Sequence, residues 1–396
     1  MPKLRGTQSA GSAKNSRLAA HKPPNLKGTK HQAQDGSNKA GSGAADAEKK
    51  AASSHQQKAL SHSLQQGLLD VFGRAFAPAL ASPRLNEALQ AVKQALFERD
   101  FAGAFGTVDD NRTDADDTAA EKKGKSVSFE IDSVIPPLDA YAARWSPTRA
   151  LCYASVLASP VVQEHWNAAQ ESSDDQPESK APLRMVAIGG GAAEIVAFGT
   201  LLTRGEAAND RAGDLVLVDS GPWASVVDRL RTSMVESGTD SPKAALIEPA
   251  ERFNVDVRQR DILKVDDEEM GKLIGGSGEA GAVTTLITLF FTLNELFTAG
   301  GLGSAATFLL RLTAASPAGT VLLVVDSPGS YAEMAVGSQA RKYPMRWLLD
   351  KFLLQDSEAW TKAHENEAIW FRLSQSLSYP IRLEDMRYQV HLYVRK

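Results

Sequence analysis

The chain has 396 residues, 43% of them hydrophobic, so it can build one large α/β core with appendages or two modest domains. Its single cysteine, Cys152, excludes an internal disulfide and zinc sites built from Cys-x-x-Cys pairs, and its seven histidines form no metal-spaced cluster. The longest apolar stretch, residues 282–293, is too short for a membrane helix, and no signal-peptide pattern opens the chain. We expect a protein of a reducing, intracellular compartment, with no metal and no membrane contact.

The formal net charge of −4 conceals an asymmetry along the chain. Residues 1–50 hold ten Lys or Arg against three Asp or Glu, which leaves the remainder of the chain at about −11. The segment 1–54 is rich in Gly, Ser and Ala and almost lacks large apolar side chains, which predicts a disordered basic tail. Its function stays open between a solubilising extension and a phosphate contact or nuclear address.

Residues 55–166 are predicted to form an N-terminal helical region. Apolar residues recur at helical spacing up to about residue 105, which predicts two helices. Six acids within 108–125 predict a solvated acidic loop, and 167–182 is a second acidic insertion of this kind. Between them, residues 141–156 (YAARWSPTRALCYASV) are aromatic, basic and helical in period, and we take Arg144 and Trp145 as candidate substrate contacts.

From residue 183 to 396, short apolar runs alternate with amphipathic stretches, which predicts βαβ units and a parallel sheet. The successive predicted strands are 185–188, 215–218, 254–257, 285–291 and 321–325. Two later runs, 371–373 and 388–394, are joined by too few residues for a crossover helix and should pair antiparallel. The fold class is therefore α/β and Rossmann-like: a mostly parallel seven-stranded sheet with an antiparallel C-terminal strand. Between the fifth strand and this pair we expect a helical insert, 331–369.

The first predicted strand runs directly into a turn of small residues, 189–194 (GGGAAE). Such a turn before a helix lets backbone approach a ligand at the helix N-terminus, although an ordinary glycine-rich loop would look the same. A dinucleotide-binding turn needs G-x-G-x-x-G, and Glu194 occupies its last position, which disfavours pyrophosphate. A methionine-derived cofactor has no phosphate and is not repelled by an acid. The candidate cofactor residues of this turn are Gly189, Gly190, Gly191 and Glu194.

Acids also end the next two predicted strands. Asp219 can accept both ribose hydroxyls of a nucleoside, although Asp219-Ser220-Gly221 also suits a plain turn. Asp261 can accept a hydrogen bond from an adenine amino group, and as a helix cap it would look the same. Because the carboxyl ends of parallel strands share one edge of the sheet, one crevice can hold these candidate cofactor residues.

Polar residues follow the fourth and fifth predicted strands, and we take Asn294, Glu295 and Asp326 as candidate catalytic residues. The alternative is that Asn294 caps a helix, Glu295 is an exposed first-turn acid and Asp326 belongs to a plain loop. In the insert, Arg341 and Tyr343 lie where cations alternate with aromatics, which suits contact with a splayed RNA segment. There the alternative is that the aromatics are core and the cations are solvated.

Five stretches of the sequence resemble the fungal 25S rRNA uridine-N3-methyltransferase family. They are YAARWSPTRALCY from Tyr141, IGGGAAE, LFFTLNELF, KYPMRWLLD from Lys342 and the closing YPIRLEDMRYQVHLYVRK. The resemblance spans about residue 65 to the C-terminus, and the basic tail and the acidic insertions lie outside it. By matched motif, the cofactor turn falls on Gly189, Gly190, Gly191 and Glu194, and the fourth-strand motif on Asn294 and Glu295. A standard methyltransferase turn often has an acid just before its glycines, where this chain has Ala187 and Ile188.

The resemblance implies a class I methyltransferase that moves a methyl group from S-adenosylmethionine to N3 of a uridine in large-subunit rRNA or a pre-ribosomal particle. It favours the nucleus or nucleolus, with the cytoplasm left open, and we expect a monomer. Two alternatives remain: a non-catalytic, nucleoside-binding ribosome-assembly factor, and a methyltransferase acting on a protein or a small molecule.

Overall fold

The structure is a computed structural model. It describes residues 60–105, 134–167, 182–203, 211–236, 245–275, 284–329, 331–336 and 339–396, which belong to one unit, Gln56–Lys396. The predicted tail 1–54, the acidic loop 108–125 and all but the end residues of the acidic insertion 167–182 lie outside the described residues.

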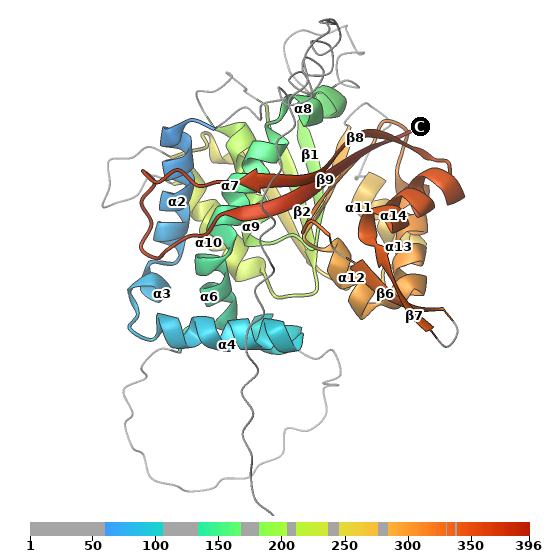
Figure 1. Cartoon of the computed structure of the whole chain (residues 1–396). Coiled ribbons are helices and arrows are strands. Elements are labelled where there is room, and N and C mark those ends of the chain that lie inside the picture. The colour runs from blue at the N-terminus through green and yellow to red at the C-terminus, as the bar shows by residue number, and fades with distance from the viewer. Residues whose placement is uncertain are drawn as a thin grey trace, which may run out of the picture. The chain divides into compact units, whose positions relative to one another are not determined.

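Seven strands form one sheet in the order β3-β2-β1-β4-β5-β9-β8 (Figure 1). The parallel strands are β1 (Leu183–Ile188), β2 (Gly213–Asp219), β3 (Phe253–Gln259), β4 (Thr285–Phe290) and β5 (Val321–Asp326). Strand β9 (Met386–Arg395) pairs antiparallel with β5, and β8 (Trp360–Phe371) pairs antiparallel with β9. The predicted mostly parallel seven-stranded sheet with an antiparallel C-terminal strand is confirmed.

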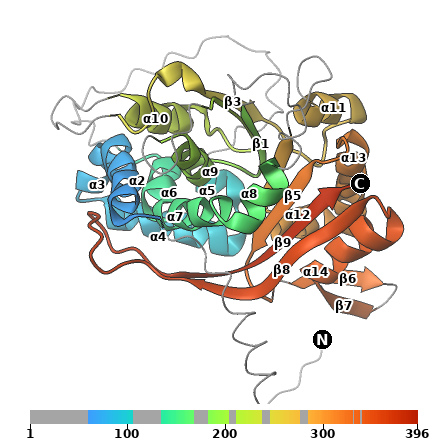
Figure 2. The same ribbon diagram turned by 90° about the horizontal axis from the view of Figure 1, so that it is seen from above.

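Helices cover both faces of the sheet, as Figure 2 shows. One face packs against α2 (His62–Ala75), α6 (Pro137–Arg144), α7 (Ser146–Leu157), α8 (Pro160–Asn167), α9 (Ala192–Gly199) and α10 (Ala224–Val235). The other packs against α11 (Asp267–Gly275), α12 (Leu293–Ala299), α13 (Gly301–Ala315) and α14 (Met345–Asp350). Strands β4 and β5 are buried along their whole length, which explains their continuous apolar sequences.

The predicted N-terminal helical region is a layer of this fold, because its side chains share one hydrophobic core with the sheet. Leu68 and Phe72 of α2 belong to the same cluster of buried residues as Met185 of β1 and Leu217 of β2. Where two helices were predicted up to residue 105, the described residues 60–105 form four: α2, α3 (Ala77–Ala81), α4 (Leu85–Glu98) and α5 (Phe101–Phe105). Pro78 lies in the first turn of α3, where proline is tolerated, and this separates α3 from α2.

The predicted helical insert at 331–369 is wrong over most of its length. Residues Tyr331–Val336 (β6) and Gln339–Pro344 (β7) form an antiparallel hairpin. Helical backbone is confined to α14 and a π-helical segment, Lys351–Asp356, and β8 already begins at Trp360. The hairpin sequences YAEMAV and QARKYP contain many helix-favouring residues, so pairing between the strands overrides their local propensity. The antiparallel partner predicted at 371–373 overlaps β8 only at Phe371, because β8 is an edge strand with many exposed residues and no apolar run before that point.

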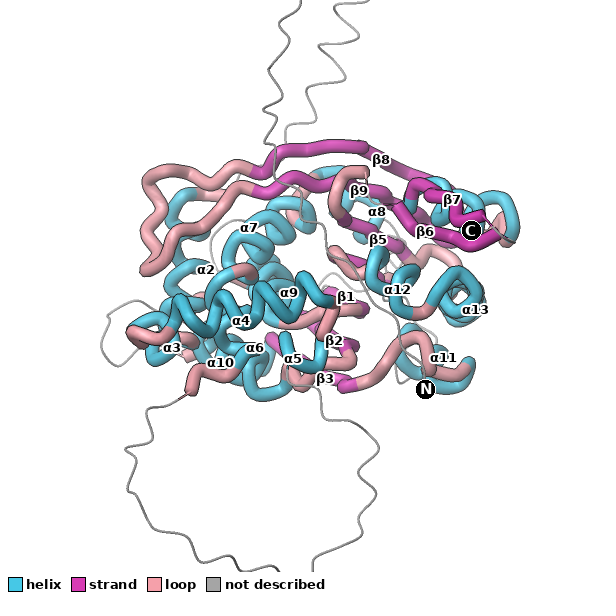
Figure 3. The backbone as a smooth tube through the Cα atoms, turned by 60° about the horizontal axis from the view of Figure 1, so that its bottom comes forward, coloured by secondary structure: helices cyan, strands magenta, loops and turns pink. Residues whose placement is uncertain are grey.

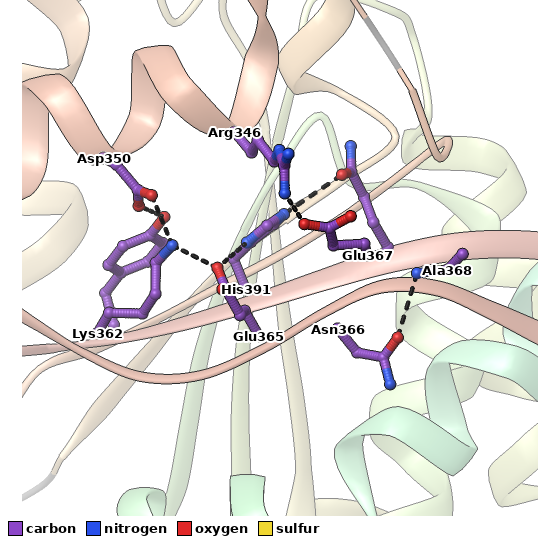
Figure 4. A network of polar contacts seen from close by, with 10 residues as sticks. Arg346, Asp350, Lys362, Glu365, Asn366, Glu367, Ala368 and His391 are labelled. Carbon is purple, nitrogen blue, oxygen red and sulfur yellow. Dashed lines mark hydrogen bonds and ion pairs between the residues drawn. The ribbon is translucent and has the colours of Figure 1, made fainter.

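A polar network attaches β8 and β9 to α14 (Figure 4). Lys362 Nζ lies 2.7 Å from Asp350 Oδ2 and 2.6 Å from Glu365 Oε2. His391 is buried beside them, with Nδ1 3.8 Å from Glu365 Oε2, and burial lowers its pKa to about 4. His391 is therefore neutral at pH 7, and its role is structural.

Neither a metal nor a membrane contact follows from the described part of the chain. No group of three or more His, Cys, Asp or Glu residues there is placed to hold a metal ion. No helix there combines the length and the apolar content needed to cross a bilayer.

The shared core makes α2 essential to the stability of the sheet. We expect Phe72→Ala to lower the free energy of unfolding by about 3–5 kcal/mol, because the ring is 0% exposed and its removal leaves a cavity. Denaturant unfolding followed by circular dichroism measures this change. Phe97→Ala is the control, since that ring is 84% exposed and its loss should change stability by less than about 0.5 kcal/mol. Equal effects in the two variants would show that α2 is not part of the common core.

Candidate functional site

A cavity of about 630 Å³ opens at the carboxyl edge of the sheet, a volume typical of small-molecule sites. Its walls come from the ends of β1, β2 and β4, the loop after β3, and helices on both faces of the sheet. Figure 3 shows four of these helices, α4, α5, α9 and α12, on this side of the molecule. Six sequence-predicted residues line the cavity: Gly189, Gly191, Glu194, Asp219, Asp261 and Glu295. The order of the parallel strands reverses between β1 and β4, so this is the crevice where doubly wound sheets bind their ligands.

The glycine turn after β1 is built so that backbone faces the cavity. Gly189 has a φ of +71°, and a Cβ there would lie 2.1 Å from the Thr292 hydroxyl oxygen. A Cβ on Gly191 would lie 2.8 Å from the indole ring of Trp223. Gly190 does not line the cavity, and its Cβ would meet Ala187 at 2.7 Å. The first and third glycines are therefore required by close approaches of other chain segments.

Glu194 fixes the start of α9. Its Oε2 accepts a hydrogen bond from the Gly191 amide at 2.8 Å, which forms the acidic half of a capping box. The side chain is 5% exposed, and burial raises the pKa of its carboxyl to about 7. Glu194 thus has a structural role within the turn, because its carboxyl accepts the hydrogen bond at the start of α9.

Asp219, at the end of β2, holds the next turn. Its Oδ1 accepts hydrogen bonds from the Gly221 amide at 2.7 Å and from the Trp223 indole nitrogen at 3.0 Å. Burial raises the pKa of this carboxyl to about 6. The turn interpretation therefore holds for Oδ1, while Oδ2 receives no hydrogen bond from the described residues and can accept one from a ligand.

Asp261 lies in the loop after β3 and contacts two residues of that loop. Its Oδ1 accepts from the Leu263 amide at 3.1 Å, and its Oδ2 lies 3.3 Å from Lys264 Nζ. The helix-cap interpretation is wrong, because the next helix begins at Asp267. Apolar Ile262 and Leu263 line the cavity beside it.

The three candidate catalytic residues occupy different environments. Glu295 lines the cavity from the first turn of α12; burial and the nearby Asp326 carboxylate raise its pKa, while Arg99 lowers it. Asp326 is 3% exposed and lies beneath the cavity, where it accepts hydrogen bonds from the Ser327 amide at 2.6 Å and the Asn294 amide at 3.3 Å. Asn294 does not cap α12, because the N-cap position is Thr292. Neither Asn294 nor Asp326 lines the cavity.

The sequence analysis missed a cluster that closes the cavity on the α7 side. Arg149 donates a hydrogen bond to the Tyr141 hydroxyl, and its guanidinium lies 5.3 Å from the centroid of the Phe291 ring. Both side chains line the cavity together with Phe291 and Trp223. A signal was present, because Arg149 is the one charged residue in a helix whose other residues are all buried. Such a cation needs a partner or a ligand.

Two of the four predicted substrate residues, Arg144 and Trp145, lie beside the cavity. Arg144 stacks over Trp145 at 5.9 Å and forms an ion pair with Glu384 at 2.9 Å. The Trp145 ring lies 5.5 Å from that of Tyr141, which lines the cavity, although neither Arg144 nor Trp145 does. Arg341 and Tyr343 lie in β7, and their side chains are outside the part that the structure describes.

The doubly wound sheet, its glycine turn and the acid at the end of β2 define a Rossmann-like protein with a crevice at the carboxyl edge of its sheet, where such folds bind their ligands. Residues 72–394 match the family described as "Putative SAM-dependent methyltransferase". The chain belongs to this family of methyltransferases, and the expectation that its cofactor is S-adenosylmethionine is confirmed.

Individual relatives are similar to the chain to different degrees. The 25S rRNA (uridine(2843)-N(3))-methyltransferase of Saccharomyces cerevisiae is 29% identical over an alignment of 361 residues that covers 83% of this chain and 85% of that protein. A solved 16S rRNA (adenine(1408)-N(1))-methyltransferase from Catenulisporales acidiphilia is 13% identical over 58% of this chain and 91% of its own, with a TM-score of 0.30. N-methyltransferase NodS from Bradyrhizobium japonicum WM9, in complex with S-adenosyl-l-homocysteine, is 12% identical over 60% and 88%, with a TM-score of 0.28. These TM-scores are too low for the two structures to support a conclusion about this chain.

The raised pKa of Glu194 predicts a pH-dependent penalty on folding. A carboxyl whose pKa is about 7 when folded and lower when unfolded makes stability fall as pH rises from about 4.5 to 7. Glu194→Gln keeps an acceptor for the Gly191 amide but removes the charge. We expect the variant to gain roughly 1–3 kcal/mol over the wild type between pH 4.5 and pH 8, measured by denaturant unfolding across that range. A difference that does not change with pH would contradict this assignment.

Proposed function

We propose that this protein transfers the methyl group of S-adenosylmethionine to N3 of a uridine in large-subunit rRNA, on the rRNA itself or in a pre-ribosomal particle. The observation that carries the proposal is the convergence of the glycine turn, Asp219 and Glu295 on one cavity in a chain that aligns with 85% of the yeast relative. That relative is named for this reaction. We expect the protein to act as a monomer in the nucleus or nucleolus.

The cavity offers a partner for each part of the cofactor. We assign the adenine to the loop of Asp261, where apolar Ile262 and Leu263 also line the cavity, and the ribose hydroxyls to Asp219 Oδ2. The backbone of Gly189 and Gly191 faces the methionine part, since no side chain fits there. The order of these contacts follows the strands β3, β2 and β1 across the sheet.

Arg149 completes this set as the partner of the methionine carboxylate. It lines the cavity from α7, which packs against α9, the helix that follows the glycine turn. Its hydrogen bond to Tyr141 and its stacking on Phe291 hold the guanidinium in one orientation. A fixed, always charged fork is suited to bidentate recognition of a carboxylate. In this arrangement Glu194 holds the turn through the Gly191 amide instead of contacting the ligand.

The uridine would enter from the β4 side of the cavity. The cofactor would supply an electrophilic methyl group on its sulfonium. As the new N–C bond forms, the S–C bond to that methyl group breaks, the thioether product leaves, and the imide proton of N3 must be removed. Glu295 is the carboxylate placed to accept that proton, and its raised pKa makes it a stronger base than an ordinary glutamate. Asp326 is assigned a positioning role, because it binds the amide at the start of α12 and so fixes Glu295.

N3 lies in the Watson-Crick face of uridine, so the base must be unpaired or flipped before it can react. Phe291 and Tyr141 are cavity-lining aromatic rings on which an extruded pyrimidine can stack. Asn294 follows the start of α12 and remains a candidate for contact with the substrate, although it does not line the cavity.

Loss of the charge at Asp219 should weaken cofactor binding. Asp219→Asn keeps Oδ1 as an acceptor for Gly221 and Trp223 but removes the anionic partner of the ribose hydroxyls. We expect the affinity for S-adenosylmethionine, measured by calorimetry, to fall about ten- to hundredfold. Asp214→Asn is the matched control, because Asp214 lies at the other end of the same strand. Unchanged affinity in Asp219→Asn would remove this residue from the cofactor site.

The reaction itself is tested in cells that lack the protein. Mass analysis of their rRNA nucleosides should show loss of 3-methyluridine from the large subunit, and the wild-type chain should restore it. A non-catalytic assembly factor or a methyltransferase of proteins or small molecules would leave this nucleoside unchanged. That result would overturn the proposed function.

Glu295→Gln separates catalysis from binding. We expect turnover on large-subunit rRNA to fall about 10²- to 10⁴-fold, because a base is lost, while the calorimetric affinity for S-adenosylmethionine stays the same. In the wild type, activity should rise with pH as Glu295 loses its proton and then level off, and the variant should lack this step. Full activity in Glu295→Gln would show that another group accepts the proton.

A further inference from the structure

An exposed tryptophan at the end of β8 is flanked by two arginines. Trp370 is 52% exposed, the Arg372 guanidinium lies 4.9 Å from its ring centroid, and that of Arg387 lies 5.8 Å away. The pairing of β8 with β9 places Arg387 directly opposite Trp370. Arg387 forms no ion pair with another described residue, and the partner of Arg372 is the exposed Asp385 at 3.1 Å. We call Trp370, Arg372 and Arg387 the tryptophan–arginine cluster.

The register of the sheet places this cluster at the same edge as the cavity. Gln389 of β9 pairs with Asp326, the last residue of β5. Arg387 lies two residues before Gln389 in the antiparallel β9 and therefore beyond the carboxyl end of β5. The Gln389 side-chain amide donates to the Ser327 carbonyl at 3.0 Å, which fixes this part of β9 beside the loop that follows β5.

A series of side-chain contacts connects the cluster to a residue that lines the cavity. Asp385 binds Arg372, and the next residue, Glu384, forms the ion pair with Arg144. Arg144 stacks on Trp145, whose ring contacts the cavity-lining Tyr141. The loop between β8 and β9 is also attached to α6 by the Tyr379 hydroxyl, which donates to the Ala143 carbonyl at 2.9 Å. The loop between β8 and β9 thus contacts both the tryptophan–arginine cluster and the Arg144–Trp145 pair at the end of α6.

The chemistry of the cluster fits single-stranded RNA. An exposed indole offers a face on which a base can stack, and guanidinium groups beside it can bind the adjoining phosphates. The cluster brings positive charge to a chain whose residues beyond 50 carry a net charge of about −11. A protein partner would bury the indole as well, but it would not need two cations at the edge where the substrate enters.

We propose that the tryptophan–arginine cluster binds the single-stranded part of the RNA substrate next to the target uridine, with a base stacked on Trp370 and phosphates held by Arg372 and Arg387. The inference rests on the proposed function, since it takes the substrate to be RNA. It adds a contact outside the cavity and accounts for recognition of the strand, whereas the cavity residues act on the cofactor and the uridine.

The test measures binding of a fluorescent 12-nucleotide oligouridylate to the full chain by anisotropy. We expect Trp370→Ala to weaken binding by about tenfold and Trp370→Phe to retain most of it, because a phenyl ring still stacks. Arg387→Gln should weaken binding and reduce the slope of log K against log salt by about 0.7, as expected for one lost phosphate contact on a single strand. Phe97→Ala is the control, since this ring is 84% exposed but lies in α4, and we expect it to leave RNA affinity unchanged.

The outcomes separate this inference from the proposed function. Unchanged RNA affinity in Trp370→Ala and Arg387→Gln, or a wild type that does not bind the oligonucleotide, overturns the cluster as an RNA site; a surface for a protein partner gives the same unchanged affinity. Intact 3-methyluridine formation would then leave the proposed function standing. Conversely, RNA binding that depends on Trp370 in a protein that forms no 3-methyluridine supports the cluster and overturns the reaction. Calorimetric affinity for S-adenosylmethionine checks folding, and Arg387→Gln carries the test if Trp370→Ala does not fold.

Discussion

The close approach between the end of β1 and the end of β4 is the constraint on which the site depends. The Thr292 hydroxyl donates to the Ile188 carbonyl at 3.2 Å and occupies the space that a side chain at position 189 would need. Because only glycine fits, the chain can turn sharply and expose its backbone to the crevice. The turn then places the Gly191 amide where it donates a hydrogen bond to the Glu194 carboxyl in the first turn of α9. Helix α9 packs with α7 in one core, and this fixes Arg149 at the cavity wall.

The charges around the crevice suit a ligand that is cationic overall and carries a carboxylate. Burial disfavours the ionised forms of Glu194 and Asp219 and raises their pKa values to about 7 and 6. A bound cation would favour ionisation of these carboxyls and offset part of that cost. Arg149, held between Tyr141 and Phe291, supplies the single fixed positive charge on the α7 side of the same cavity. Perturbed carboxyls and a fixed cation in one cleft are typical of functional sites.

Much of the sheet could be predicted from the sequence, because strands buried on both faces read as continuous apolar runs. Strands β1, β2, β4 and β5 follow this rule, whereas β3 is an edge strand whose sequence alternates between apolar and polar residues. The acids that follow the strands mark the crevice. Strand β8 and the β6–β7 hairpin do not follow the rule, because the edge strand is mostly exposed and the hairpin sequences favour a helix in isolation. Their pairing is a tertiary property that local patterns do not encode.

The site was predictable to the extent that it lies at strand ends. Gly189, Asp219 and Glu295 were found by that rule. Arg149 was missed because it lies inside a helix, and Phe291 because an apolar residue at the end of β4 reads as part of the strand. The depth of Asp326 depends on its pairing with Gln389 of β9, about sixty residues later in the chain, and a position beneath the cavity has no signature in the local sequence.

Phe291 has a left-handed backbone, with a φ of +55°, at a position where a bulky residue pays about 1–2 kcal/mol for that conformation. Its amide donates to the Val325 carbonyl at 2.7 Å, and its ring lies against the Arg149 guanidinium. A glycine at this point would relax the backbone and lose the ring. The strained backbone of Phe291 thus accompanies a preorganised surface for the proposed substrate. Selection for thermal stability and selection for turnover should therefore favour different residues at position 291.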